Sequence, residues 1–231
     1  MAIFDLDAKI TEEDLSGINR KARQPVYLYV EAEREAGVTE LRTALQEFLR
    51  GILGNPTLQA SADVEICVFD QTGCTILKEC GSITDVRLER FSQIRPTDGQ
   101  SVRLAPVLET ALDRIAAQKR KYRSSDISYG KPSLLVFTAG NLADELWQLQ
   151  EVTARPLREA SVDILPVCPN PDHPTLKKIS SQGRIMQMPV ERAYTELFWE
   201  IRNSMERLSR STAATYQELS DSLVDGSQYF L

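Results

Sequence analysis

Apolar residues run almost without a break from Pro25 to Val30, and charged residues follow them directly. A run this apolar is typical of a strand buried on both faces, as in the centre of a parallel sheet. In open α/β sheets, ligands bind beyond the carboxyl ends of the strands. The sequence therefore places a candidate site at the residues that follow this strand, which are Glu31, Glu33, Arg34 and Glu35.

Strand and helix patterns alternate along the rest of the chain. Residues 63–70 and 74–80 are joined by a tight turn, which predicts a hairpin and one antiparallel strand at the sheet edge. Further strands are expected at 133–138, 162–167 and 184–188. Helical spacing of apolar residues predicts helices at 37–53, 103–123, 142–160, 175–181 and 192–208, and a short turn or helix near 86–91.

The pattern predicts an α/β, Rossmann-like fold with a mostly parallel central sheet, one antiparallel edge strand and helices on both faces. Pro156 is expected to kink its helix or to end it early. The expected organisation is a lead-in over 1–20, one domain over 21–210 and a flexible tail over 211–231. The tail ends in Tyr229-Phe230-Leu231, and a docking peptide for a partner is the alternative to disorder there.

The charge balance does not favour nucleic-acid or membrane binding. The chain has 33 acidic and 27 basic residues, a net charge of −6. Its main basic cluster, 118–123, is expected to complement a helix C-terminus, with phosphate binding as the alternative. The start of the chain has no signal-peptide pattern, and no apolar run approaches the roughly 20 residues of a membrane helix. We therefore expect a cytoplasmic protein.

Other reactive side chains are sparse. The four cysteines fit neither a zinc site nor a disulfide framework and are expected to be reduced and mostly buried. His173 is expected to be a loop residue near Cys168, not half of a nucleophilic pair. Trp147 and Trp199 are expected to pack in or at the edge of the core, with base stacking as the alternative. Asp70 and Asp98 fit turn chemistry, and no phosphate-binding glycine loop is present.

Three stretches carry a resemblance to a known family: PVYLYVEAEREA (25–36), LETALDRIAAQKRKYR (108–123) and KPSLLVFTAGNLADELW (131–147). With the order of elements, they resemble the von Willebrand factor A domain, and within it the bacterial cytoplasmic branch associated with tellurium resistance. The resemblance covers about residues 20 to 210. It implies a metal-ion-dependent adhesion site built from an Asp and two Ser, a Thr and a second Asp.

Position by position, the resemblance implies that this metal site has degenerated. Glu31 stands at the first Asp, and Glu33 and Glu35 at the two Ser. Val102, or Ser101 if the loop shifts by one, stands at the Thr, and Ala139 at the second Asp. Magnesium requires oxygens in octahedral geometry at about 2.0–2.1 Å, and neither Val102 nor Ala139 offers a side-chain oxygen. We therefore expect no cofactor and no metal. The alternative is a rebuilt site on Glu31, Glu33 and Glu35 for Ca²⁺ or Mn²⁺, less suited to Mg²⁺.

The sequence and the resemblance together favour a non-enzymatic interaction module, a scaffold or adaptor in a bacterial multi-protein stress-response or defence system. The resemblance implies kinase, phosphatase or ATPase partners. The alternatives are a cation-dependent binding module and a small-molecule enzyme with paired carboxylates. We expect the partner-binding face to comprise Glu31, Glu33, Arg34, Glu35, Ser101, Val102, Arg103, Ala139 and Asn141.

Overall fold

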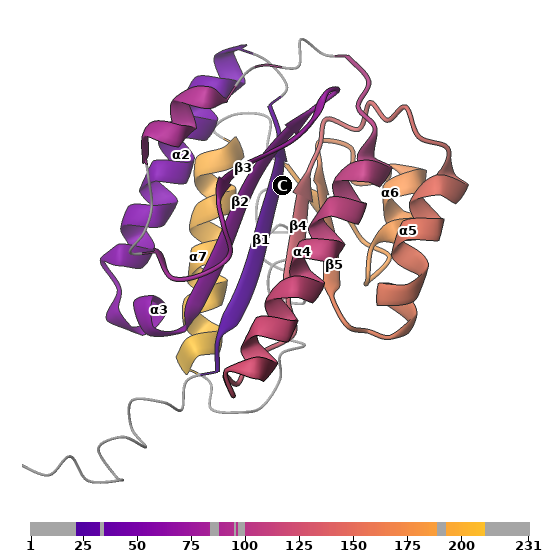
Figure 1. Cartoon of the computed structure of the whole chain (residues 1–231). Helices are drawn as coiled ribbons and strands as arrows, with labels where there is room; N and C mark the ends of the chain where they lie inside the picture. Colours follow the sequence, from indigo (N-terminus) through magenta and orange to yellow (C-terminus); the bar gives the residue numbers. More distant parts are fainter. Residues whose placement is uncertain are drawn as a thin grey trace, which may run out of the picture.

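The computed structural model describes residues 22–32, 35–83, 88–94, 96, 100–188 and 193–210. Six strands form one sheet in the order β3-β2-β1-β4-β5-β6. All neighbouring strands are parallel except β2 and β3, which form an antiparallel hairpin at one edge. Helices cover both faces of the sheet (Figure 1). The predicted fold class is therefore confirmed, including the antiparallel edge strand.

The strands lie where the apolar runs predicted them, with small shifts at their ends. Their bounds are β1 Gln24–Glu31, β2 Ala62–Asp70, β3 Gly73–Lys78, β4 Ser133–Phe137, β5 Asp163–Cys168 and β6 Met186–Gln187. All eight residues of β1 are buried, because strands pair with it on both edges and helices cover both faces. The apolar run 25–30 is thus the central strand.

The helices divide into two layers (Figure 1). On one face lie α2 Glu35–Leu53, α3 Pro56–Ser61 and α7 Ala193–Arg210; on the other lie α4 Leu104–Ser124, α5 Leu146–Arg158 and α6 Pro174–Ile179. A short 3₁₀ helix, η2, spans Leu88–Gln93. Alternate β1 residues serve the two layers: Val26, Leu28 and Val30 pack with α2 and α7, whereas Tyr27 and Tyr29 pack with α4.

Three local expectations were incomplete or wrong. The sequence missed α3, which Asn55 caps by accepting bonds from Thr57 N and Leu58 N at 3.0 and 3.3 Å. Pro156 does not stop α5, which continues to Arg158 because the proline lies in its last turn. Trp147 and Trp199, which were expected in or at the edge of the core, are exposed at 62% and 53%.

Other expectations of local chemistry hold. The four cysteines form no disulfide, and Cys67 and Cys168 are buried. Asp70 accepts bonds from Thr72 N and Gly73 N at 2.7 and 3.2 Å, the turn chemistry expected for the hairpin. Asp98 lies outside the described residues. None of the helices in the described ranges has the length and apolarity needed to cross a bilayer.

Candidate functional site at the carboxyl edge of the sheet

Glu31 ends the central strand, and its side chain turns into the protein. It is only 2% exposed. Its Oε2 accepts a hydrogen bond from Thr138 Oγ1 at 2.7 Å and another from Ala139 N at 2.9 Å. Thr138 and Ala139 follow β4, the strand beside β1. The carboxylate therefore joins the ends of two neighbouring strands. We call this arrangement the Glu31 clasp, after Glu31, Thr138 and Ala139.

The loop after β4 is held by a second set of bonds. Gly140 N donates to Thr138 Oγ1 at 3.1 Å, and His173 Nε2 lies 3.0 Å from Gly140 O. Gly140 has a φ of +90°, and a Cβ there would lie 3.1 Å from Cys168 Sγ and 3.2 Å from the His173 ring. Glycine is therefore favoured at this position by both its backbone conformation and its close contacts.

The segment that leads into α4, around Val102, is hydrogen-bonded to the loop after β4. Val102 and Leu142 form a parallel bridge, in which Val102 N donates to Asn141 O at 2.9 Å and Ala143 N donates to Val102 O at 2.8 Å. Asp144 then caps α4, accepting bonds from Leu104 N and from Ala105 N. A carboxylate at a helix N-terminus satisfies unpaired N–H groups and the helix dipole.

The described residues at the positions of the implied metal site are bonded within the protein, are buried or lack a side-chain oxygen. Glu31 is engaged with Thr138 and the β4 loop, the Val102 side chain is buried, and Ala139 has no side-chain oxygen. Within the described ranges, no group of three or more His, Cys, Asp or Glu side chains is arranged to hold a metal ion. Glu33 lies outside those ranges, and only the backbone of Glu35 is described.

The structure separates the predicted binding face into buried and exposed parts. Glu31 and Val102 are buried and cannot present their side chains to a partner, which corrects that part of the prediction. Ser101, Arg103 and Asn141 are exposed, and Ala139 is half-buried. Arg34, like Glu33, falls outside the described residues. Whether a partner binds the exposed part stays a prediction.

His173 and Cys168 come together at Gly140 but are not arranged as a nucleophile and its base. Leu176 N donates to His173 Nδ1 at 3.4 Å, as part of the cap of α6. The other ring nitrogen, Nε2, faces Gly140 O. Both nitrogens are thus bonded to backbone groups, so neither is directed at the Cys168 thiol, as proton abstraction would need.

Sequence reasoning missed a buried ion pair below the site. Glu65, which is 1% exposed, accepts bonds from Arg114 Nε at 2.7 Å and Arg114 Nη2 at 2.9 Å. Tyr29 Oη and Cys80 N also donate to this carboxylate, at 2.8 and 3.2 Å. The pair raises the pKa of Arg114, and burial raises the pKa of Tyr29. An acidic residue, Glu65, inside an otherwise apolar strand was the feature of the sequence that could have indicated a buried ion pair.

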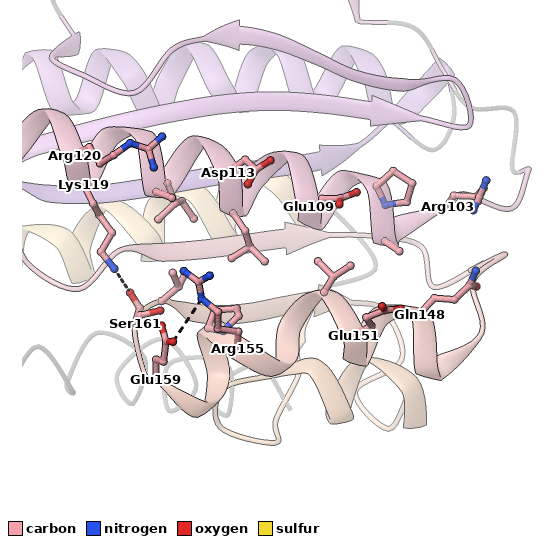
Figure 2. A pocket seen from close by; sticks show the side chains of 18 of the residues that line it. Arg103, Glu109, Asp113, Lys119, Arg120, Gln148, Glu151, Arg155, Glu159 and Ser161 are labelled. Atoms are coloured by element: carbon pink, nitrogen blue, oxygen red, sulfur yellow. Dashed lines mark hydrogen bonds and ion pairs between the residues drawn. The ribbon is translucent and has the colours of Figure 1, made fainter.

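A second unpredicted feature is a surface groove between α4 and α5, about 920 Å³ in volume. It begins at Arg103 beside the carboxyl edge of the sheet and runs to Lys119 and Ser161 at the opposite edge (Figure 2). Trp147, Leu112 and Val152 are among the apolar residues that line it. The groove thus runs from the carboxyl edge of the sheet, where the candidate site lies, to the amino edge.

No protein-family model matches the sequence, and no curated protein sequence matches it. Solved structures match in fold at very low identity. The pilus adhesin SpaC from Lactobacillus rhamnosus GG matches over 81% of this chain and 30% of its own, at 9% identity and a TM-score of 0.57. The TFIIH p34 N-terminal domain matches over 78% of this chain and 96% of its own, at 10% identity and a TM-score of 0.54.

A third match names the fold. The von Willebrand factor A domain of SpRpn10 matches over 84% of this chain and 100% of its own, at 10% identity and a TM-score of 0.50. The chain spans 47% of the length of the mussel byssus protein PTMP1 and 30% of the adhesin SpaC, so it corresponds to a part of those longer proteins. At such identities the likeness concerns architecture alone. The chain therefore has a von Willebrand factor A-like fold.

Proposed function

We propose that this protein is a non-enzymatic interaction module, a scaffold or adaptor that binds a protein partner without a metal ion. The observation that carries the proposal is the Glu31 clasp. In the fold's metal-dependent form, the acid at this position would hold a cation. Here its carboxylate instead accepts bonds from Thr138 and Ala139. These bonds join the end of β1 to the loop after β4 through protein groups, which supports a binding face that needs no bridging cation.

The fold likeness supports a binding role. One of the matching structures is named a pilus adhesin, and another is a domain of TFIIH p34. Three exposed residues of the predicted face, Ser101, Arg103 and Asn141, are polar or cationic and lie on two adjoining loops. A partner surface that offers carboxylates and hydrogen-bonding groups complements them.

The system in which the module works follows from the resemblance stated above. We propose a bacterial cytoplasmic stress-response or defence assembly, with a kinase, phosphatase or ATPase as the partner. The resemblance to the tellurium-resistance branch is what supports this finer assignment.

Partner capture at the edge tests the proposal. The variant Ser101→Arg/Arg103→Glu/Asn141→Arg changes exposed side chains only. The matched control is Arg50→Glu/Ser125→Arg/Ser128→Arg, three exposed positions at the amino edge with the same types of substitution. Quantitative pull-down from the native host should lose a partner with the first variant and retain it with the control. If both variants recover every protein equally, the carboxyl edge is not the binding face.

Metal dependence is tested in the same assay. Recovery of the partner should be unchanged by EDTA, and Mg²⁺, Mn²⁺ or Ca²⁺ should not shift the melting temperature of the isolated protein. Binding that EDTA abolishes would instead favour a rebuilt glutamate-rich cation site. A stoichiometric metal in the purified protein would also contradict the proposal.

A further inference from the structure

Two of the four cysteines, Cys67 and Cys74, are neighbours on the β2–β3 hairpin. In the register of the two strands, Cys67 is paired with Ile76 and Cys74 with Phe69. Residues two positions apart in a strand point to the same face of a sheet. Both thiols therefore point into the core beneath α4, where Cys67 is buried and Cys74 packs against its edge. They are diagonal neighbours on one face, an arrangement in which cross-strand side chains interact.

The two thiols interact directly. A hydrogen bond between them has the largest influence on both groups, because it lowers the pKa of Cys74 and raises the pKa of Cys67. Burial adds to the rise at Cys67 and opposes the fall at Cys74. Cys67 Sγ also lies 3.5 Å from Val68 O, a second acceptor for the same hydrogen. Cys74 is thus the thiol of the pair that ionises first, and the S–H group of Cys67 stabilises its thiolate.

Solvent reaches the pair through Cys74. This residue is half-buried, whereas Cys67 is buried. Its strand, β3, is the outer strand of the sheet and pairs with β2 (Figure 1). The thiolate is the form of cysteine that attacks oxidants. Redox-sensor cysteines combine a low pKa and solvent access with a second cysteine beside them that resolves the oxidised product. Cys74 has the features of the first role, and Cys67 has the position of the second.

The other two cysteines provide an internal comparison. Burial raises the pKa of the Cys80 thiol to about 11, so this group keeps its proton at neutral pH. Its sulfur lies 4.0 Å from Tyr122 Oη. Cys168 is fully buried beside Gly140. An oxidant in solution should therefore react with Cys74 before it reacts with Cys80 or Cys168.

A bond between the two sulfurs requires a small movement of β3. The Cα atoms of diagonal neighbours are about 7–8 Å apart, and those of a disulfide are usually about 4.4–6.8 Å apart. The register of the hairpin already shifts between Ile66 and Cys67, and such irregularities bend and twist a strand locally. As the outer strand, β3 can approach β2 while the other strand pairs are kept. A disulfide that distorts the backbone is more easily reduced, so the bond should be reversible.

We propose that Cys67 and Cys74 form a reversible redox pair that takes a hydroperoxide as its substrate. The Cys74 thiolate attacks the peroxide, so that an S–O bond forms as the O–O bond breaks. The hydroxide or alkoxide that leaves takes up the proton that Cys74 had released. The Cys67 sulfur then attacks the sulfenic acid, the S–S bond forms and the S–O bond breaks, and hydroxide leaves with the Cys67 proton as water. The peroxide gains the two electrons that the thiols lose, and a low-molecular-weight thiol reduces the disulfide again.

The redox pair lies at the same edge of the sheet as the candidate site. Phe69 is paired with Glu31 on one side and with Cys74 on the other. Cys74 is therefore level with the carboxyl end of the central strand, and formation of the disulfide would shift the tip of the hairpin at that edge. The redox chemistry itself does not depend on the function proposed above.

Titration of the reduced full chain, 1–231, with hydrogen peroxide tests the pair. The remaining thiols are alkylated in denaturant, and the chain is then digested with trypsin. The tryptic peptide 51–78 contains both cysteines. It should lose the mass of two hydrogen atoms and carry no alkyl group. Cleavage before Asp70 should leave its two parts joined until dithiothreitol is added. Cys74 should be consumed at least about tenfold faster than Cys80.

Three variants separate the two roles. Cys67→Ala should stop the reaction at the sulfenic acid of Cys74, which dimedone traps. Cys74→Ser should slow the oxidation of Cys67 at least about tenfold, because the accessible thiolate is absent. The matched control, Cys80→Ser, should form the disulfide as the natural chain does. Far-ultraviolet circular dichroism reports that each variant is folded.

Four results would overturn the proposal. The first is oxidation of Cys80 before Cys74, and the second is a sulfenic acid at Cys74 that persists in the natural chain. The third is a disulfide that joins two chains, seen as a dimer in non-reducing electrophoresis. The fourth is a disulfide that forms only after unfolding in urea, because the register of the hairpin would then have no part in it.

Discussion

The Glu31 clasp should contribute measurably to the free energy of unfolding, and its two hydrogen bonds set the expected magnitude. Replacement of Glu31 by alanine removes the acceptor of two hydrogen bonds, at 2.7 Å from Thr138 Oγ1 and 2.9 Å from Ala139 N. Hydrogen bonds to a charged group contribute about 1.5–3 kcal/mol each. Release of a buried carboxylate from its desolvation cost offsets part of this loss. We therefore expect Glu31→Ala to lower the free energy of unfolding by about 3 kcal/mol.

Glutamine separates the charge of Glu31 from its shape. Its amide oxygen can accept the same two bonds, so only the charge-assisted part of their strength is lost. Glu31→Gln should therefore cost about 1 kcal/mol, well below the cost of alanine. Thr138→Val removes one donor, and its effect should be smaller in the Glu31→Ala background than in the natural protein, since the two side chains interact.

Urea unfolding followed by circular dichroism measures these free energies, and an unchanged m-value shows that the variants unfold in the same way. A loss below about 1 kcal/mol for Glu31→Ala would show that the clasp contributes little. A loss for Glu31→Gln as large as that for Glu31→Ala would show that charge, not hydrogen-bond geometry, is what matters. Additive effects of Glu31→Ala and Thr138→Val would contradict the bond between them.

Three further predictions follow from the buried groups. Arg114→Met should lower the free energy of unfolding by about 3 kcal/mol, because it leaves the buried Glu65 carboxyl group without its ion-pair partner. The double variant with Glu65→Gln should recover stability in urea unfolding. A cost below about 1 kcal/mol for Arg114→Met would refute this reasoning. Gly140→Ala should lower the free energy of unfolding by about 2 kcal/mol and the melting temperature by several degrees, because alanine is strained at a φ of +90° and its Cβ would press on Cys168 Sγ. An unchanged melting temperature would argue against that strain. Burial raises the pKa of the Cys80 thiol from 9.0 to about 11, so the protonated thiol favours the folded state. This contribution is complete below pH 9 and is lost as pH rises toward 11, because the unfolded chain ionises first. The stability difference between the natural protein and Cys80→Ala should change over that range, and a constant difference would contradict the shift.

Much of the fold could be predicted because the decisive signals are local. The run 25–30 predicted a strand covered on both faces, and β1 is the central strand. Helical spacing predicted α2, α4 and α7 to within a few residues. The turn at 71–73 predicted the β2–β3 hairpin. Each of these depends on residues close together in the sequence, where periodicity and turn chemistry act directly.

Misses occurred where local rules compete. The Asn55-Pro56 pair follows the helix predicted at 37–53. It has the features of a cap and a first turn, and it begins α3, which was not predicted. Pro156 was expected to kink its helix or to end it early. A proline in the last turn disrupts few further bonds, and α5 continues to Arg158. Trp147 was expected to pack, although hydrophobic type alone does not determine burial.

The sequence by itself determined that a buried strand ends in an acidic triplet, and that the positions at Val102 and Ala139 lack side-chain oxygens. Only the tertiary structure decided what the first acid does. The donors to Glu31, Thr138 and Ala139, are more than 100 residues away in sequence and come within hydrogen-bond distance because β1 and β4 are neighbours in the sheet. Strand order is set by packing among distant segments, and no local pattern encodes it. The same holds for the α4–α5 groove, whose walls meet only because both helices cover one face.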